Sequence, residues 1–209
     1  MSGSYGPKDF QAEFGVSRET MSDLQAYAAL LEKWNSRINL VSQSTLPELW
    51  RRHMSDSGQV FSLAGAVGLW VDIGSGAGFP GLVAAVMAKN TYPEMRFVLV
   101  ESDARKAAFL TTVIRETGAN AEVKIARIEE LPPAGADILS ARALAPMGKL
   151  LEYAERHRKQ GGICLFPKGA QAESELTAAR ENWHIEAEAI PSVTDSQAVI
   201  YRIGAFARV

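Results

Sequence analysis

The chain has 209 residues, of which 47% are hydrophobic and 22% are charged, and its formal net charge is −2. This length suits one domain of ordinary size, which buries enough surface to need neither a disulfide nor a metal for stability. The single cysteine, Cys164, excludes a disulfide framework and a cysteine-rich zinc site, and no metal-ligand spacing is present. We therefore expect a cytoplasmic protein. The small negative charge argues against tight non-specific binding to nucleic acid, so any RNA contact must come from local basic patches.

No signal peptide is expected, because the first residues of the chain contain no apolar core. Residues 63–88 form a long apolar stretch, but Asp72, Pro80 and several glycines interrupt it. We interpret this stretch as a buried strand, a loop and a helix, and we predict no membrane span.

The first 60 residues predict a helical cap on the remainder of the chain. Residues 1–16 are expected to be a loose or weakly helical lead-in. Ser17 is a suitable N-cap for a helix that runs to about Asn35 and presents one apolar face. A second helix is predicted to start near Thr45, with Pro47 in its first turn. The inward-facing residues of the two helices would be Met21, Leu24, Tyr27, Leu31 and Trp34, followed by Leu46, Leu49, Trp50 and Met54.

From Leu69 onward the pattern alternates between strands and helices. The predicted strands are 69–73, 96–100, 121–125, 136–140, 162–166, 183–191 and 198–207, and the predicted helices are 81–89, 104–117 and 147–160. This alternation predicts an α/β, Rossmann-like fold, with a mostly parallel seven-stranded sheet covered by helices on both faces. The two successive strands at the end predict an antiparallel hairpin at one edge, which is more typical of methyltransferases than of dehydrogenases. We expect a cap of residues 1–60 and a cofactor-binding domain of residues 61–209 that form one structural unit.

The segment 72–81, Asp-Ile-Gly-Ser-Gly-Ala-Gly-Phe-Pro-Gly, is the most informative one. Glycines directly after a buried strand let the backbone turn sharply and approach a ligand, and the following helix N-terminus favours an anionic group. Residues 76–81 match the dinucleotide fingerprint G-x-G-x-x-G, but that register starts two residues after the first glycine. Gly74, Gly76 and Gly78, with Asp72 before them, match the loop with which methyltransferases bind S-adenosylmethionine. Both interpretations stay open on spacing alone, as does a purely structural turn.

Two further positions are candidate cofactor contacts. Glu101 closes the second strand, where a carboxylate can accept both ribose hydroxyls of either NAD or S-adenosylmethionine. The alternative role for Glu101 is a cap for the next helix, although Ser102 and Asp103 already suit that position. Ile128 and Glu129 follow the third strand, where this fold usually holds the adenine, largely through backbone groups.

Five segments together resemble the glucose-inhibited division protein B family, also called RsmG. They are residues 34–40 (WNSRINL), 53–57 (HMSDS), 72–81 (DIGSGAGFPG), 140–143 (SARA) and 166–169 (FPKG). The resemblance implies a class I methyltransferase that uses S-adenosylmethionine to methylate N7 of a guanine in 16S ribosomal RNA. It also implies cofactor contacts at Gly74, Phe79, Ile128, Glu129 and Arg142. Two departures are the residues after His53, where the family more often has Ile-Leu-Asp-Ser-Leu, and Ile128, where it has Ala.

Arg142 and Lys168 are the candidate catalytic residues, because each follows a strand on the rim where this fold places its substrate. Arg142 could bind a phosphate, a base edge or the cofactor carboxylate, and Lys168 could bind an RNA phosphate. No base-catalyst pair is needed, since guanine N7 carries a lone pair and no proton. His53 and Asp56 could form a polar pair between cap and core. The basic groups Arg51-Arg52-His53 and Arg156, Arg158 and Lys159 would extend an RNA-binding rim if they lie beside Arg142 and Lys168.

We therefore expect a monomer that acts on 16S rRNA within the small ribosomal subunit or its assembly intermediate, with no membrane partner. Three alternatives remain. A small-molecule methyltransferase would cover its cofactor with a lid instead of a basic rim. An RNA-binding module could keep S-adenosylmethionine as a structural ligand. An NAD-dependent oxidoreductase would need a proton relay, and no Tyr-x-x-x-Lys pattern is present.

Overall fold

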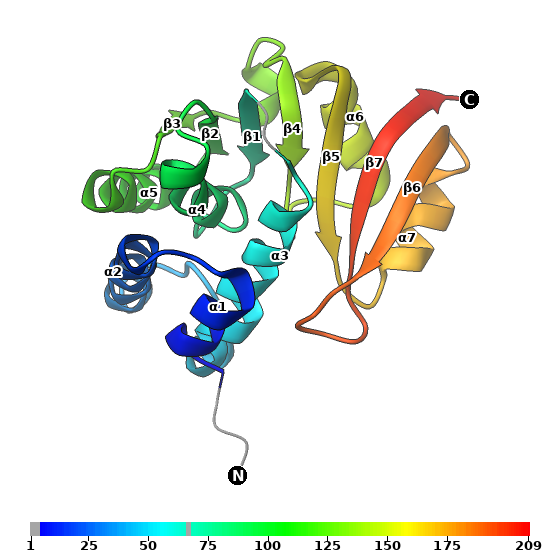
Figure 1. The fold of residues 1–209 in the computed structure, drawn as a ribbon. Coiled ribbons are helices and arrows are strands. Elements are labelled where there is room, and N and C mark those ends of the chain that lie inside the picture. Colours follow the sequence, from blue (N-terminus) through cyan, green and yellow to red (C-terminus); the bar gives the residue numbers. More distant parts are fainter. Residues whose placement is uncertain (1–4, 66–67) are drawn as a thin grey trace.

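A seven-stranded sheet organises the computed structural model, which describes residues 5–65 and 68–209 (Figure 1). The strand order is β3-β2-β1-β4-β5-β7-β6, so the chain starts in the middle and reverses direction after β3. The pairs β1–β2, β1–β4, β2–β3 and β4–β5 are parallel. The strands are β1 Leu69–Ile73, β2 Arg96–Glu101, β3 Ala121–Ile125, β4 Ala136–Ser140, β5 Arg158–Lys168, β6 Trp183–Pro191 and β7 Val199–Arg208. The predicted fold class is confirmed.

The predicted antiparallel hairpin is also present, at one edge of the sheet. β7 pairs antiparallel with both β5 and β6, and β6 forms the outer edge. The loop of residues 192–198 that joins the two strands therefore lies at the same end of the sheet as the carboxyl end of β5.

The helices that alternate with the strands are α4 Gly81–Thr91, α5 Ala104–Thr117, α6 Met147–His157 and α7 Ala172–Ala179. Helix α5 has the predicted bounds because Asp103 accepts the amide N–H groups of its first turn and Gly118 ends it in a left-handed conformation. Helix α6 ends three residues earlier than predicted, since β5 already begins at Arg158. The sequence pattern predicts no element at α7.

The N-terminal segment is more ordered than predicted. Residues Pro7–Phe14 form helix α1, and the fully buried Phe10 packs against Phe14 and Trp50. Helix α2, Arg18–Asn35, follows with the predicted N-cap, Ser17. The second predicted helix is not one α-helix: it consists of a 3-10 segment (Gln43–Glu48), a π segment (Trp50–Ser55) and helix α3 (Asp56–Ser62). Leu49 and Met54 are buried as expected.

Each face of the sheet carries its own hydrophobic cluster. The cluster on one face includes Trp70, Ile138 and the apolar sides of α4 and α5, and it extends without a break into α1 and α2. The other cluster lies under α6 and α7 and includes Val71, Leu139 and Phe166. The N-terminal helices thus share a core with the sheet, while a division of the chain at residue 60 stays a prediction.

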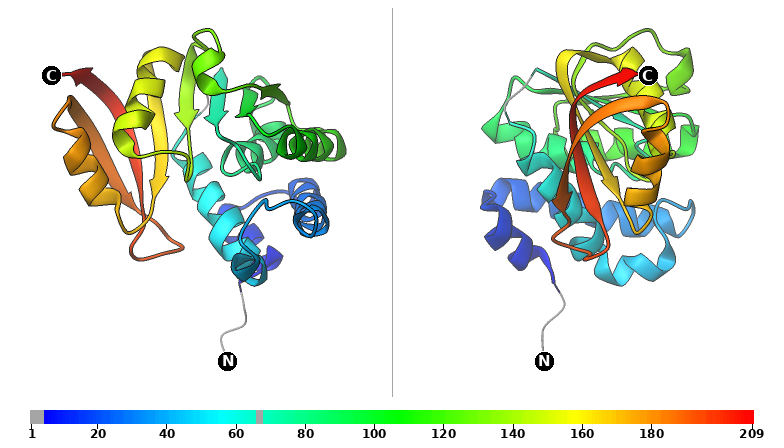
Figure 2. Two further views of the ribbon diagram at one scale, coloured as in Figure 1. Left: turned by 180° about the vertical axis from the view of Figure 1, so that it is seen from behind. Right: turned by 90° about the vertical axis from the view of Figure 1, so that its right-hand side faces the viewer.

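The carboxyl ends of β1, β4 and β5 point toward the N-terminal helices (Figure 1). Helix α3 and the loop between β6 and β7 lie on this same side of the sheet, as the views from behind and from the side also show (Figure 2). In the part of the chain that the structure describes, no helix combines the length and the apolar character that crossing a membrane requires.

Candidate active site

The glycine loop after β1 has three glycines with left-handed backbone angles, φ 65° at Gly74, 56° at Gly76 and 94° at Gly78. A Cβ on Gly76 would have only the Gly74 carbonyl near it, at 3.8 Å, so this glycine faces open space. A Cβ on Gly74 would lie 2.5 Å from the side chain of Leu144. A Cβ on Gly78 would overlap the Tyr27 hydroxyl. Gly78 is therefore required by packing against α2, whereas Gly74 and Gly76 border the outer side of the loop.

Glu101 is buried and connects the glycine loop to the start of α5. One carboxylate oxygen, Oε2, accepts the Gly76 N–H at 2.8 Å, and the other, Oε1, accepts the Asp103 N–H at 2.7 Å. The carboxylate thus holds the loop in shape. Each oxygen has a second lone pair, so this geometry leaves the ribose contact as a prediction.

A small cavity of about 90 Å³ lies beside the glycine loop. Gly74, Ile128 and Glu129, three of the predicted cofactor residues, line it together with Leu144 and Tyr153. The Tyr153 hydroxyl donates to Glu129 Oε1 at 2.5 Å, which ties this segment to α6. The other predicted cofactor residues do not line this cavity: Gly76, Gly78, Phe79, Glu101 and Arg142.

The side chain of Phe79 points away from the cavity into the N-terminal helices. Phe79 is 3% exposed, and its ring stacks with Tyr27, at a centroid distance of 5.8 Å, and with His53, at 5.1 Å. The guanidinium carbon of Arg142 lies 4.8 Å from the centroid of the same ring. Only the backbone of Phe79 is therefore available to a cofactor.

A buried polar network lies beneath the loop. Trp70 Nε1 donates to Ser140 Oγ at 2.7 Å, and Ser140 Oγ donates to Asp72 Oδ1 at 2.5 Å. The other carboxylate oxygen of Asp72, Oδ2, is buried and has no hydrogen-bond partner among the residues that the structure describes. Burial raises the pKa of Asp72 to about 6, although the hydrogen bond from Ser140 opposes the shift.

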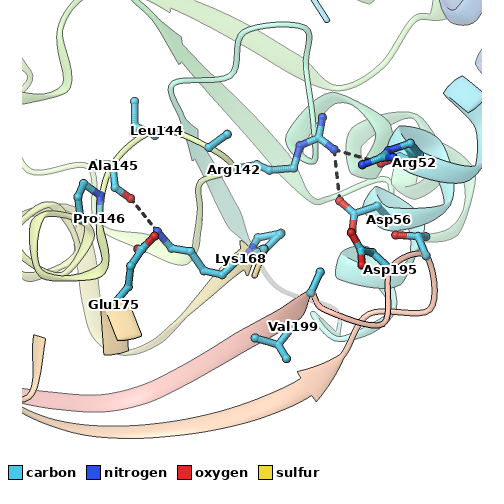
Figure 3. Close-up of a pocket in the computed structure, with 15 residues that line it drawn as sticks. Arg52, Asp56, Arg142, Leu144, Ala145, Pro146, Lys168, Glu175, Asp195 and Val199 are labelled. Carbon is cyan, nitrogen blue, oxygen red and sulfur yellow. Dashed lines mark hydrogen bonds and ion pairs between the residues drawn. The ribbon is translucent and has the colours of Figure 1, made fainter. Parts of the chain in front are cut away.

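A second and larger cavity, of about 460 Å³, opens between the ends of β4, β5 and β7 and helix α3 (Figure 3). Both candidate catalytic residues line it, together with Arg52, Asp56, Leu144, Glu175, Thr194 and Asp195. Leu144 lines this cavity and also the smaller one beside Gly74. The two cavities therefore share Leu144 as a bordering residue, at the carboxyl ends of the strands.

Arg142 is largely buried between the cap and the end of β4. Its Nη1 lies 3.3 Å from Asp56 Oδ2, and 81% of the arginine side chain and 88% of the aspartate side chain are covered, since their exposed fractions are 19% and 12%. Burial lowers the pKa of Arg142 and raises the pKa of Asp56, and the attraction between the two charges opposes both shifts. Arg142 is thus held in a fixed position and is not a solvated rim charge.

Lys168 lines the larger cavity, but its ammonium group already has partners. Nζ donates to Glu175 Oε2 and to the Ala145 carbonyl, both at 2.7 Å, and the side chain is 9% exposed (Figure 3). The expected point charge open to an RNA phosphate is therefore not the arrangement found. Lys168 instead connects the end of β5 to α7 and to the loop after β4.

His53 does not form the possible polar pair with Asp56. Its Nε2 is 3.0 Å from Thr45 Oγ1, and its ring stacks on Phe79. Burial, with the charges of Arg142 and Arg52 as smaller causes, lowers the pKa of His53 to about 3. The histidine is therefore neutral at physiological pH and its contacts are structural.

Only one of the two basic groups lies at the larger cavity. Arg52 lines that cavity, with a half-exposed side chain. Arg158 and Lys159 lie at the start of β5, whereas Lys168 ends that strand, so they lie at the opposite end of the sheet. Lys159 pairs there with Asp137. The second basic group therefore does not belong to a rim beside Arg142 and Lys168.

Several residues of the larger cavity have no place in the sequence-based site, among them Leu144, Glu175 and Asp195. Asp195 lies in a short polar segment between two predicted strands, which is a signal for a loop that carries function. Leu144 and Glu175 carry no such signal, because only the folded chain brings them to Gly74 and Lys168.

The family model and the relatives that match this chain carry the same description. A family model described as rRNA small subunit methyltransferase G matches residues 20–201. A protein of Cereibacter sphaeroides named ribosomal RNA small subunit methyltransferase G is 52% identical over 199 residues, which are 95% of this chain and 97% of that protein. A protein of Rhodospirillum centenum with the same name is 51% identical over 205 residues, covering 98% and 93% of the two chains.

Solved structures support the fold. A SAM-dependent methyltransferase from Aquifex aeolicus superposes with a TM-score of 0.56 at 16% identity, covering 75% of this chain and 93% of that one. A TehB-like SAM-dependent methyltransferase from Corynebacterium glutamicum gives a TM-score of 0.53 at 14% identity, covering 71% and 86%. The fold is therefore the Rossmann-like fold of class I methyltransferases. On the match of its sequence over nearly its full length, the chain belongs to the rRNA small subunit methyltransferase G family.

Proposed function

We propose that this protein transfers a methyl group from S-adenosylmethionine to N7 of a guanine in the 16S ribosomal RNA of the small subunit. The observation that carries the proposal is that two cavities share Leu144 as a bordering residue, one beside the glycine loop and one lined by Arg142 and Lys168. A methyl donor in the first and a base in the second would have their reacting atoms next to each other. Family membership and the names of the relatives support the reaction and its substrate.

The residues present fit the cofactor. Gly76 leaves space on the outer side of the loop, and Asp72 Oδ2, which has no hydrogen-bond partner among the described residues, is an acceptor that suits an ammonium group. Ile128 and Glu129 would hold the adenine, and Glu101 the ribose. Leu144 covers Gly74 in this conformation, so we expect its side chain to move when the methionine part of the cofactor binds.

The chemistry requires orientation and no general base. When bound, S-adenosylmethionine supplies a methyl group to the N7 lone pair while the carbon–sulfur bond breaks and its electron pair stays on sulfur. No proton moves, and the positive charge passes from sulfur to the guanine. The protein therefore has to align the base, and alignment of this kind supplies about 7–11 kcal/mol of a barrier.

Arg142 is the residue that we expect to set the base against the methyl donor. It follows β4, it is fixed by Asp56 and by the Phe79 ring, and it lines the larger cavity. Its pairing with Asp56 also reduces the net positive charge beside a base that becomes cationic. Lys168 would act indirectly, by holding the loop at Ala145 and helix α7 in place.

The proposed substrate is RNA within a ribosomal particle and not naked RNA. The exposed Arg52 is a cation at the larger cavity that can meet a phosphate, and one such contact gives modest affinity for naked RNA. A folded small subunit or an assembly intermediate would present the guanine and supply the remaining contacts. The protein would act as a cytoplasmic monomer.

Transfer of labelled methyl groups to small subunits from a strain that lacks this gene tests the proposal. We expect incorporation to depend on the protein and to be at least ten-fold lower with Arg142→Ala. Arg180→Ala is the control, because Arg180 lies beyond the end of α7, outside both cavities. Calorimetry with S-adenosylhomocysteine and with NAD distinguishes a methyltransferase, which binds the first, from an oxidoreductase, which binds the second. Cofactor binding without any methyl transfer would favour a non-catalytic RNA-binding module.

A further inference from the structure

Asp195 is held in a defined turn at the mouth of the larger cavity. Its Oδ1 accepts the Gln197 N–H at 2.9 Å, and its backbone carbonyl accepts the Ala198 N–H at 3.0 Å. Asp195 lines this cavity together with Asp56. Figure 3 shows both at the cavity with Arg142. Oδ2 of Asp195 takes no part in this turn, so it can accept a hydrogen bond from another donor.

The loop that carries Asp195 is tied to helix α3. The Gln59 side chain donates from Nε2 to the Pro191 carbonyl at 2.8 Å and accepts the Val193 N–H with Oε1 at 3.0 Å. The Arg51 guanidinium also donates to the Val193 carbonyl. These contacts link residues more than 130 positions apart in the chain and fix the loop over the cavity.

The charges around the cavity leave Asp195 as the available carboxylate. Asp56 is paired with Arg142, and Glu175 is paired with Lys168. Among the residues that the structure describes, Asp195 has no cation within ion-pair distance, although it lines the same cavity. Asp195 is exposed, so an occupant of the cavity that presents hydrogen-bond donors can reach its carboxylate.

Guanine presents such donors on the edge opposite to N7. Its N1–H and its exocyclic N2 amino group point the same way, and one carboxylate can accept from both. Adenine has an acceptor at N1 and offers no such pair. Methylation at N7 makes the ring cationic and its N1–H and amino group more acidic, so their hydrogen bonds to a carboxylate strengthen as the reaction proceeds.

We propose that Asp195 reads the N1–H and amino edge of the target guanine and stabilises the positive charge that the base acquires. This inference rests on the proposed function. It makes Asp195 a residue that determines base specificity and that also raises the rate, because the contact is stronger in the transition state than in the bound substrate.

The first test replaces Asp195 by Asn. The Asn side chain keeps an oxygen that accepts the Gln197 N–H, so the turn persists, but it lacks the charge and presents an amide N–H₂ to the guanine donors. We expect kcat/KM for small subunits to fall about ten-fold or more, as for the loss of hydrogen bonds to a charged group. The affinity for S-adenosylhomocysteine stays within about two-fold of wild type. Glu188→Gln, an exposed charge change on β6 outside the cavity, is the matched control.

The second test identifies the contact. Small subunits are reconstituted with inosine in place of the guanosine that wild type methylates, because inosine keeps N7 and lacks only the amino group. Wild type loses about ten-fold in kcat/KM on the inosine subunits, whereas Asp195→Asn loses no more than two-fold. An Asp195→Asn enzyme as active as Glu188→Gln, or equal losses on inosine in both enzymes, overturns the inference. Absence of methyl transfer by wild type would overturn the proposed function instead.

Discussion

At the scale of single residues, the glycines of the loop after β1 are required for different structural reasons. The three left-handed glycines after β1 look equivalent in the sequence, yet Gly78 is required by the Tyr27 hydroxyl and Gly76 faces open space. A substitution at Gly76 would therefore add a side chain on the open side of the loop without disturbing the packing of α2, and it can test whether a ligand approaches there.

Replacing Gly76 by Val should abolish binding of S-adenosylmethionine in calorimetry. The Val side chain would occupy the space above the loop, and its φ of 56° adds strain of about 1–2 kcal/mol. Gly118→Val is the control, because Gly118 has a φ of 63° with open space around it at the end of α5. Equal cofactor affinity in the two variants would mean that the ligand does not approach Gly76.

His53 makes stability depend on pH. Its pKa is about 3 in the folded protein and about 6.5 in the unfolded chain, so the unfolded state binds a proton first as the pH falls. Stability due to the neutral imidazole is therefore present above pH 6.5 and is lost below it. Between pH 7.5 and 5.5 the free energy of unfolding of wild type should fall about 1 kcal/mol more than that of His53→Gln.

Denaturant titrations of both proteins at several pH values measure this difference. The two curves should run parallel between pH 7.5 and 8.5, where the histidine of the unfolded chain is already neutral. Parallel curves down to pH 5.5 would show that His53 is accessible to protons in the folded state.

At the scale of elements, the centre of the sheet is held by a polar chain across β1 and β4. The Trp70 indole and the Asp72 carboxylate share one hydroxyl, that of Ser140, and all three side chains are fully buried. Sheet pairing and this hydroxyl together fix the strand ends from which the glycine loop and Arg142 emerge.

Ser140→Ala should lower the free energy of unfolding by about 2–4 kcal/mol, because it leaves two buried polar groups without their partner. Chemical denaturation measures the change. Ser62→Ala is the control: Ser62 is an exposed residue whose hydroxyl donates to the Gly58 carbonyl, and its loss should cost less than about 0.5 kcal/mol. A similar small loss for Ser140→Ala would mean that water takes the place of the hydroxyl.

The sequence predicts the elements whose ends carry local signals. Helix α5 has both its bounds predicted because Asp103 and Gly118 are capping residues that act on their own neighbours. The start of β5 at Arg158 is not predictable in this way. Its guanidinium binds the Gly162 and Gly204 carbonyls, and Gly204 comes from a strand that is distant in the chain.

The candidate site also has parts that local sequence signals predict and parts that only distant contacts determine. The glycine loop is evident from consecutive residues, whereas the pairs Arg142–Asp56 and Lys168–Glu175 depend on which side chains the fold brings together. Arg142 and Asp56 are 86 positions apart, so no local pattern reveals that the arginine is buried and paired. The ring of Phe79 is buried in the cap because it packs against α2, which is also distant in the chain.

At the scale of the whole molecule, the cap and the sheet share one hydrophobic cluster, and the cap also supplies part of the site. Helix α3 contributes Asp56 and Gln59, which hold Arg142 and the loop between β6 and β7. We therefore expect cofactor binding to depend on the glycine loop. Binding of the target base should depend on the contacts that helix α3 makes with Arg142 and with the loop between β6 and β7.

The position of the transferred methyl group tests the central claim most directly. Small subunits from a strain without this gene are incubated with the protein and S-adenosylmethionine, and the extracted 16S RNA is treated with borohydride and aniline. N7-methylguanine is cationic, so this treatment cleaves the strand at that nucleotide. We predict cleavage at one guanine, dependent on both protein and cofactor. Methyl incorporation without cleavage, or a methyl group on another atom, would contradict the assignment.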